Sequence, residues 1–374
     1  MSNLLSPAAW IAVSRSALRH NYAAVRSLLA LDASPPRLIS VVKANAFGHG
    51  AVETARILEE CSADFFAVTT PLEALELRDA GITSRILVFL PPLLEQIPLL
   101  IEAELDLTIS DEAGLRTIAE AAQRCGQVVR VHLKVDTGMG RLGVLPGESL
   151  LLAAKLDQEK SLHLAGTYTH FARSLEESDA ATRKQFQLFQ AVLAEIENAG
   201  IDPGLRHCAN SAATLRFPEM RLDAVRPGTI LYGQYPAASV PRTLDLKETW
   251  RMQARLVSVR QVPAGTAIGY GGEFVTRRAS TLAVLPLGYA DGFGVAPSSA
   301  TAGWRGLKAL LRPRPITVSF GGRQAPVVGR ISMQLCTVDV TDIPGVAAGD
   351  VVTASARRIL ASARLPRVYE ERFP

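Results

Sequence analysis

The chain has 374 residues, 48% of them hydrophobic and 20% charged, and its formal net charge is +4. This length and composition are typical of a globular enzyme with two domains, or with one large barrel and an appendage. No segment approaches the ~20 consecutive apolar residues of a membrane span, and the basic residues are spread along the chain, so neither a membrane nor a nucleic acid is indicated as a partner.

The first two thirds of the chain alternate between short apolar or β-branched runs and stretches of helical period. Seven runs predict strands, at residues 38–42, 65–69, 86–90, 105–109, 128–135, 162–169 and 222–225, and an eighth is plausible near 205–207. Amphipathic helices are predicted between most of them, for example at residues 17–31, 52–60, 111–124 and 180–199. This α/β alternation implies parallel units, and eight strands fit a (β/α)₈ TIM-type barrel, which typically uses ~250 residues.

The pattern changes near residue 244. Short alternating runs at residues 254–262, 280–285, 316–320, 325–328 and 336–340 are separated by Gly, Pro and Asp, and little helical period remains. We therefore expect a barrel over residues 1–243 and a mainly antiparallel β domain over residues 244–374. The segment 237–249, with its prolines and polar residues, suits a linker.

The predicted barrel places a set of polar residues at one rim. Active sites of this fold lie at the carboxyl ends of the strands. The residues that follow these ends, or lie just before them, are Lys43, Lys134, Arg141, His170, Ser211, Arg226, Gly228 and Thr229. No carboxylate cluster or histidine pair with metal-ligand spacing occurs among them, so we expect no metal site.

The four cysteines are scattered without C-x-x-C spacing, which argues against a disulfide framework or a zinc site. The N-terminal residues lack the basic start of a secretory signal and are too polar for one. We therefore expect reduced thiols and a cytoplasmic protein.

Several rim residues have two readings. Lys43 is either solvated at a strand end or a desolvated amine, whose lowered pKa suits Schiff-base chemistry. Ser211, Gly228 and Thr229 form either a phosphate site after strands seven and eight or a plain turn with a helix-capping serine. Arg226 forms an ion pair at the rim or faces a pyridine nitrogen, which it would leave unprotonated because arginine keeps its proton.

Further residues are ambiguous on their own. Lys134 lies within an apolar strand and needs a partner, which Asp136 on the same strand face could supply. His170 alone is better explained as a satisfied core histidine. Three glycine-flanked motifs of the second region contain Tyr270, Tyr289 and Met333, which edge packing at hairpins would also explain.

Taken together, these stretches resemble the alanine racemase family. Eight motifs occur in the family's order: residues 41–50 (VVKANAFGHG), 132–143 (HLKVDTGMGRLG), 168–171 (YTHF), 208–214 (CANSAAT), 225–228 (VRPG), 269–271 (GYG), 288–292 (GYADG) and 329–333 (GRISM). The resemblance covers nearly the whole chain. It implies a barrel followed by a β domain, pyridoxal 5'-phosphate as cofactor, and a head-to-tail homodimer with shared active sites that interconverts L- and D-alanine.

The resemblance also implies a role for each motif residue. Lys43 binds the cofactor covalently and is one base, while Tyr270 of the partner subunit is the second base on the opposite face of the substrate. Around the cofactor, the resemblance implies that Arg226 bonds the pyridine nitrogen with support from His207, that His170 stacks near the ring, and that Arg141 assists the phenolate. It implies that the phosphate is held by Ser211, Gly228 and Thr229, and that Lys134 matches a lysine that is often carbamylated. For the substrate, it implies that Met333 of the partner subunit helps hold the carboxylate and that Tyr289 is a gatekeeper at the entrance.

Three features depart from the family pattern. Phe47 replaces a tyrosine whose hydroxyl reaches the phosphate, and Gln334 replaces an aspartate beside the methionine. The C-terminal region after Gly349 is shortened, and Tyr369 near its end does not match the family's phosphate-binding tyrosine. These departures leave two alternatives open: a broad-specificity or serine-type racemase, and a degenerate homologue that binds the cofactor weakly. A decarboxylase of the same fold would need a catalytic cysteine that Cys336 does not match.

Overall fold

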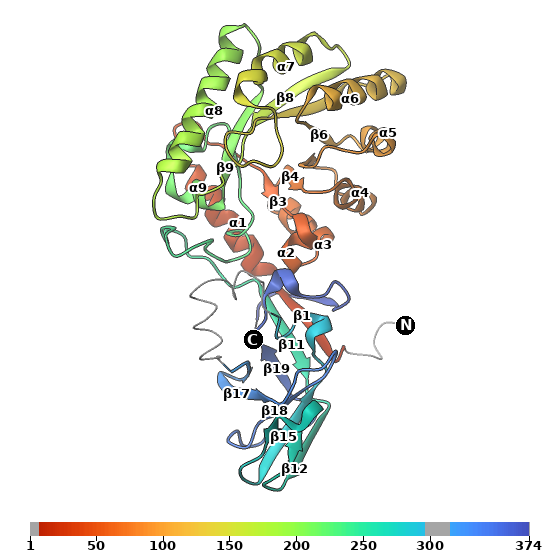
Figure 1. Ribbon diagram of the computed structural model, residues 1–374, viewed down its shortest axis with the longest axis vertical. Helices are drawn as coiled ribbons and strands as arrows, with labels where there is room; N and C mark the ends of the chain where they lie inside the picture. The colour runs from red at the N-terminus through yellow and green to blue at the C-terminus, as the bar shows by residue number, and fades with distance from the viewer. Residues whose placement is uncertain (1–6, 296–314, 374) are drawn as a thin grey trace. The chain divides into compact units, whose positions relative to one another are not determined.

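The computed structural model describes residues 7–295 and 315–373, which form two compact units. One unit spans Arg15–Thr249, and the other combines the N-terminal segment up to Ser14 with the chain from Trp250 onward. Our expected division at residue 243 assigned the N-terminal segment to the barrel. The N-terminal segment lies in the second unit because strand β1 (Ala9–Ser14) pairs with β11 (Trp250–Arg255), which Figure 1 shows beside it, and with β20 (Arg367–Glu370).

The first unit contains the predicted parallel barrel. The first barrel strand is interrupted at Ile39, so that β2 (Arg37–Leu38) pairs with β10 and β3 (Ser40–Val41) pairs with β4, which closes the sheet. All neighbouring pairs in it are parallel. The other strands are β4 (Phe65–Val68), β5 (Arg85–Val88), β6 (Asp106–Ile109), β7 (Val129–Lys134), β8 (Leu162–Tyr168), β9 (Leu205–Asn210) and β10 (Ala224–Arg226). The predicted fold class is thereby confirmed.

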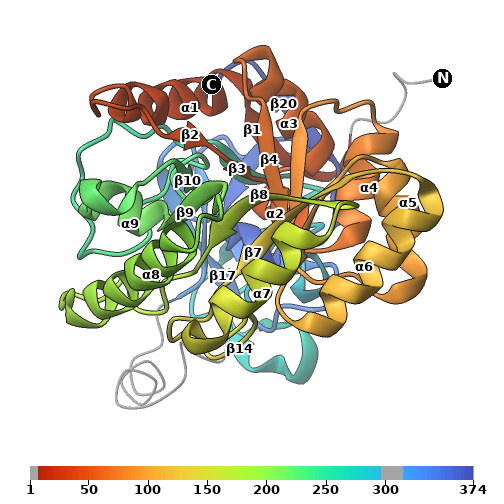
Figure 2. The ribbon, with the colours of Figure 1, turned by 90° about the horizontal axis from the view of Figure 1, so that it is seen from above.

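Helices lie outside the ring of strands (Figure 2). The helices that we predicted begin and end within two residues of the observed bounds, because each has an apolar face of helical period, as in the buried Leu18, Tyr22, Val25 and Leu29 of α1. In the described part of the chain, residues 7–295 and 315–373, no helix is both long and apolar enough to span a membrane. The α-helices around the barrel are α1 (Arg15–Leu29), α3 (Ala51–Glu60), α4 (Pro71–Asp79), α5 (Ile97–Glu102), α6 (Glu112–Cys125), α7 (Pro146–Gln158), α8 (Ala180–Asn198) and α9 (Ser211–Arg216).

The interior of the barrel is divided between apolar and polar side chains. An apolar cluster comes mainly from the first strands and comprises Ile39, Val41, Phe65, Ala67, Leu87 and Ala224. Strands β6 to β10 instead bury polar groups, namely Asp106, Thr108, His132, Lys134, His207 and Arg226. Buried polar groups are costly unless they are hydrogen-bonded, so this half of the interior depends on specific pairing.

The second unit is built on a nine-stranded sheet with the order β12-β15-β18-β17-β16-β19-β11-β1-β20. Its pairs are antiparallel except β1 with β20. The predicted run 254–262 is two strands, because the chain leaves β11 after Arg255 and re-enters the sheet as β12. The remaining strands are β12 (Ser258–Val262), β15 (Ser280–Leu285), β16 (Thr317–Phe320), β17 (Arg323–Val328), β18 (Cys336–Asp339) and β19 (Val351–Ala354), with a separate hairpin of β13 (Ala267–Ile268) and β14 (Phe274–Val275).

Candidate active site

A cavity of about 730 Å³ opens at the carboxyl ends of the barrel strands. All eight rim residues singled out in the sequence line it: Lys43, Lys134, Arg141, His170, Ser211, Arg226, Gly228 and Thr229. Four of these side chains are cationic at neutral pH in their ordinary state, and two carry hydroxyls. The wall therefore suits an anionic ligand with a phosphate-like group.

Lys43 begins an unusual turn, α2 (Lys43–Gly48). Ala44, Asn45, Ala46 and Phe47 all have φ between 52° and 54°, in the left-handed region. For residues with a Cβ this conformation costs roughly 1–2 kcal/mol each, so the surroundings must enforce it. The turn fixes where the chain leaves the strand and thus where the lysine side chain starts.

Glu73 of α4 is one of the groups that enforce the turn. Its Oε1 accepts the Ala44 N–H at 2.6 Å, while its Oε2 accepts the N–H groups of Thr69 and Thr70 at 3.0 Å each. The carboxylate thus serves the capping box of α4 and ties the residue after Lys43 to the next barrel strand. Sequence reasoning missed Glu73, although its position three residues after Thr70 does signal a capping box.

Aromatic and histidine contacts hold the other end of the turn. His49 Nδ1 lies 2.9 Å from the Ala46 carbonyl, and His49 Nε2 lies 2.8 Å from Thr249 Oγ1. The Tyr232 hydroxyl donates to the Val41 carbonyl at 3.0 Å, and its ring lies 4.9 Å from that of Phe47. The left-handed turn is therefore clamped from both sides.

The pKa values of both lysines of the cavity are lowered. Burial, and then the charge of Arg141, lowers the pKa of Lys43 below its usual value. The same two causes lower the pKa of Lys134 to about 8. Burial, together with four neighbouring cations headed by Arg226, lowers the pKa of His170 to about 3, so its imidazole is neutral at pH 7. Neutral amines are nucleophiles and bases, which is the state that Schiff-base chemistry needs.

Asp136, which we considered as a partner for Lys134, forms no ion pair with it, although its charge opposes the lowering of the Lys134 pKa. Its carboxylate accepts backbone N–H groups from Gly138, Met139, Gly140 and Arg141 at 2.7–3.3 Å and so shapes the loop that carries Arg141. Within residues 7–295 and 315–373, no carboxylate forms an ion pair with Lys134. Lys134 instead lies 5.4 Å above the Tyr168 ring.

The phosphate-like end of the cavity is built from two loops. Ser211 Oγ accepts the Gly228 N–H at 3.0 Å, which joins the loops after β9 and β10. Ser211 is not the residue that caps α9. The Asn210 side chain caps this helix by accepting the N–H groups of Ala212 and Ala213. A Cβ on Gly228 would lie 2.6 Å from Phe47 Cζ, so glycine is required for the Phe47 ring to sit here.

Arg226 closes the inner end. It is buried, and its guanidinium donates to Thr169 O at 2.7 Å and to Cys208 O at 3.3 Å, and contacts His207 Nδ1 at 2.7 Å. The Tyr168 ring stacks on that of His207, with centroids 4.9 Å apart and planes 7° apart. These contacts aim a permanent hydrogen-bond donor at the cavity from a rigid support.

The remaining predicted residues lie in the second unit and gather on its surface. Tyr270 and Tyr289 begin the 3₁₀ turns η3 (Tyr270–Gly272) and η4 (Tyr289–Asp291), and Met333 lies between β17 and β18. The N–H groups of Tyr289 and Ala290 donate to the carbonyls of Ser332 and Met333. The side chains of Tyr270, Tyr289 and Met333 are 73%, 52% and 58% exposed. The second unit thus presents these two tyrosines on its surface and not in a buried pocket of its own.

The structure also locates the residues that depart from the family pattern. Phe47 lines the cavity beside Gly228 and brings no hydroxyl there. Gln334 is exposed next to Met333. Tyr369 lies in edge strand β20, paired in register with Val13 of β1, in the second unit.

The comparisons with known proteins agree over both units. The model of the alanine racemase N-terminal domain matches residues 13–236, and that of the alanine racemase C-terminal domain matches residues 249–364. The alanine racemase of Desulfovibrio desulfuricans is 40% identical over 92% of this chain and 88% of its own, and that of Methanococcus maripaludis is 36% identical over 98% and 100%.

Solved structures give the same result. Alanine racemase from Clostridium difficile superimposes with a TM-score of 0.90 at 30% identity, covering 98% of this chain and 97% of that chain. A structure of alanine racemase from Bacillus anthracis with bound L-Ala-P has a TM-score of 0.84 at 28% identity, with 98% and 96% covered.

Proposed function

The chain belongs to the alanine racemase family, and from this premise we propose that it interconverts L- and D-alanine with pyridoxal phosphate held by Lys43. The observation that carries the proposal is the cavity, in which a half-buried lysine of lowered pKa faces cations and hydroxyls. We place the reaction in the cytoplasm, as the sequence led us to expect.

The residues of the cavity fit the cofactor. Ser211, Thr229 and the backbone of Gly228 would hold its phosphate, and Arg226 would face its ring nitrogen. The neutral imidazole of His170 would lie against the ring, and Arg141 would assist its phenolate. When bound, pyridoxal phosphate supplies the electron sink that stabilises negative charge at the substrate Cα. Because Arg226 cannot give up its proton, it would leave the ring nitrogen facing it unprotonated.

Two bases on opposite faces of the substrate would make the reaction reversible. The Lys43 amine, whose pKa is lowered by burial, would exchange the Cα proton of one enantiomer. Tyr270 of the partner subunit would exchange the proton of the other. This assignment requires a homodimer with shared active sites, and the exposed position of Tyr270 within its own unit supports it. Met333 of the partner subunit would help hold the substrate carboxylate, and Tyr289 would border the entrance.

Lys134 is suited to carbamylation. Its pKa of about 8 leaves a fraction of neutral amine at pH 7 that can attack carbon dioxide. The resulting anion would sit among Arg141, Arg226 and Lys43, which all lower the pKa of the free amine. We expect a carbamate carbon signal in the ¹³C NMR spectrum of protein equilibrated with ¹³C-bicarbonate. The signal should be missing from Lys134→Ala and present in Lys247→Ala; a spectrum without it in the wild type would contradict this assignment.

Phe47 is expected to weaken the phosphate site. A tyrosine hydroxyl at this position adds one hydrogen bond to a charged group, worth ~1.5–3 kcal/mol, so Phe47→Tyr should tighten cofactor binding roughly 10–100-fold. Phe89→Tyr is the matched control, because Phe89 lines the same cavity after β5 and is not among the residues placed at the phosphate. Dissociation constants from fluorescence titration measure the effect. An unaltered constant for Phe47→Tyr would mean that the phosphate is held elsewhere.

Two other activities are less well supported. A decarboxylase would need a reactive cysteine in the second unit, but Cys336 is buried on β18 and burial raises its pKa to about 12. A racemase for serine or for many amino acids would differ at the substrate entrance, to which we assign Tyr289, Met333 and Gln334.

A substrate panel tests the proposed function. With saturating pyridoxal phosphate, chiral chromatography should show that L-alanine is converted with a higher kcat/KM than L-serine or larger amino acids. A preference for serine would support the serine-type alternative. A folded protein that binds the cofactor but racemises none of them would support a degenerate homologue.

A further inference from the structure

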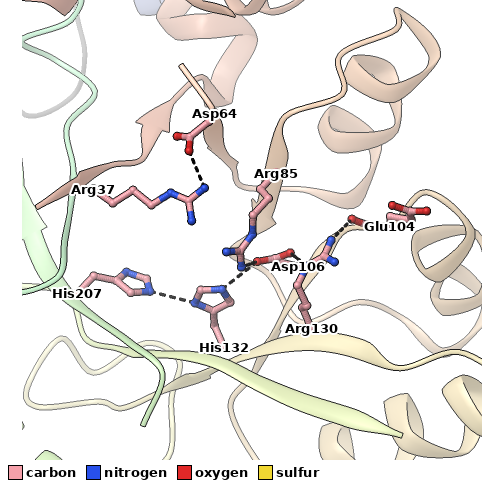
Figure 3. Close-up of polar contacts among 8 residues, drawn as sticks. All are labelled: Arg37, Asp64, Arg85, Glu104, Asp106, Arg130, His132 and His207. Carbon is pink, nitrogen blue, oxygen red and sulfur yellow. Dashed lines mark hydrogen bonds and ion pairs between the residues drawn. The ribbon is translucent and has the colours of Figure 1, made fainter. Parts of the chain in front are cut away.

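A chain of buried polar groups crosses the barrel from the candidate site to the opposite end. Arg226 is the last residue of β10, at the carboxyl end, and Asp106 is the first residue of β6, at the amino end. His207 and His132 lie between them. Figure 3 shows the part of this row that runs from His207 through His132 to Asp106. The links are Arg226 Nη1 to His207 Nδ1 at 2.7 Å, His207 Nε2 to His132 Nδ1 at 3.0 Å, and His132 Nε2 to Asp106 Oδ2 at 3.1 Å.

Each link has a single proton arrangement. Arginine only donates, so the contact with Arg226 exists only while His207 Nδ1 accepts and the His207 proton lies on Nε2. His207 Nε2–H then donates to His132 Nδ1, which places the His132 proton on Nε2. That proton is donated to Asp106. An ionised carboxylate can only accept. The two ends of this row, Arg226 and Asp106, therefore both require that every hydrogen bond is donated in the direction from Arg226 to Asp106.

Asp106 is held as an acceptor at the far end. It is fully buried, yet it forms ion pairs with Arg85 and with Arg130, whose Nε lies 2.7 Å from Oδ1 (Figure 3). Burial alone would raise the pKa of Asp106, but the hydrogen bond from His132 and the two guanidinium groups lower it below the usual range. The carboxylate is therefore ionised whenever the barrel is folded near neutral pH.

The barrel wall is shaped to admit this chain. A Cβ on Gly166 of β8 would lie 2.6 Å from His132 Nδ1, so only glycine lets the His132 ring reach its neighbour His207. Arg226 itself has no ion pair with a carboxylate anywhere in the described ranges. Its orientation therefore depends on neutral acceptors, of which His207 is one.

We propose that Asp106 is a positioning residue for this site: through His132 it fixes both histidines as Nε2–H tautomers and so keeps His207 Nδ1 as the acceptor that orients Arg226. The link of Arg226 to the cofactor rests on the proposed function. The tautomers themselves do not, because they can be measured on the cofactor-free protein.

The first test uses wild-type protein labelled with ¹⁵N-histidine. His132 and His207, assigned through His132→Asn and His207→Asn, should each show a protonated Nε2 and an unprotonated Nδ1, with and without pyridoxal phosphate. A protonated Nδ1 on either ring would overturn the proposal. If both tautomers are as expected but the protein racemises nothing, the proposed function fails and the role of Asp106 in setting the tautomers stands.

The second test replaces Asp106 with asparagine, whose amide can also donate. We expect mixed tautomers at His132 and His207 and a kcat for alanine lowered about tenfold, as for one lost charge-assisted hydrogen bond, with KM nearly unchanged. Asp106→Glu should restore both readouts in part. The matched control is Asp223→Asn. It removes a carboxylate that lies just before β10 and pairs with Arg206, outside the row of hydrogen bonds from Arg226 to Asp106, so it should alter neither readout.

A third variant covers the case in which Asp106→Asn does not fold. Gly166→Ala leaves Asp106 and its arginines in place, but its Cβ would lie 2.6 Å from His132 Nδ1 and 2.7 Å from the Leu205 carbonyl oxygen of β9, so both the His132 ring and the strand that carries His207 must shift. It should give the same mixed tautomer at His207 and the same loss in kcat. Wild-type tautomers and kcat in the folded Asp106→Asn or Gly166→Ala protein would overturn the proposal.

Discussion

Replacing Lys43 with alanine is expected to abolish both covalent cofactor binding and racemisation, with a loss in kcat of about 10⁴-fold or more. In the proposed mechanism Lys43 has two functions, because it would hold the cofactor aldehyde and exchange the substrate proton, and general base catalysis alone contributes ~10²–10⁴-fold. The structure gives it a fixed origin in the left-handed turn and a lowered pKa. The measurements are the visible absorbance band of the lysine-bound cofactor and the rate of conversion of L-alanine.

Lys247→Ala is the control for this change. Lys247 is half-exposed, pairs with Asp245 outside the cavity and should leave band and rate unchanged. A Lys43→Ala protein that keeps the absorbance band would show that another amine binds the cofactor, and Lys134 would be the next candidate because it lines the same cavity.

Replacing Tyr270 with phenylalanine is expected to affect the two substrate enantiomers unequally. Removal of the Cα proton should slow by ~10²–10⁴-fold for L-alanine and far less for D-alanine, because the Lys43 amine still serves the opposite face. Exchange of the Cα proton for deuterium, followed from each pure enantiomer in D₂O, measures each direction separately.

The D-alanine direction is the internal control for this variant, since it reports on cofactor binding and folding in the same protein. Tyr270 is 73% exposed in its own unit, so stability should change by less than about 0.5 kcal/mol. Equal losses in both directions would contradict the two-base assignment.

Much of the barrel could be predicted from the sequence because its signals are local. Eight apolar runs and the helical periods between them gave the strands and helices, and fold geometry then placed Lys43, Arg226 and the other rim residues around one cavity. The second unit was harder. Strands β1 and β20 pair although they are separated by most of the chain, and no local pattern reveals such a pairing. The apolar run of β1 (AWIAVS) does indicate a strand, but we did not predict it.

The support of the site was predicted less well than its lining. A run of alanine, asparagine and phenylalanine residues gives no sign of positive φ, so the turn after Lys43 and its tie to Glu73 could not be foreseen. Asp136 was given the wrong partner because strand alternation says which face a side chain is on and not which donor it finds. Asp106 and His132 were missed, although the alternation of Arg130, His132 and Lys134 with apolar residues in β7 does indicate a polar interior.

Conversion of L-alanine to D-alanine by cofactor-stripped protein, titrated with pyridoxal phosphate, tests the central claim most directly. We predict turnover that is absent without the cofactor, rises with its concentration and saturates, and that the same maximal rate is reached at lower concentration by Phe47→Tyr. A folded protein with no turnover at any cofactor concentration would contradict the claim that this chain is a working alanine racemase.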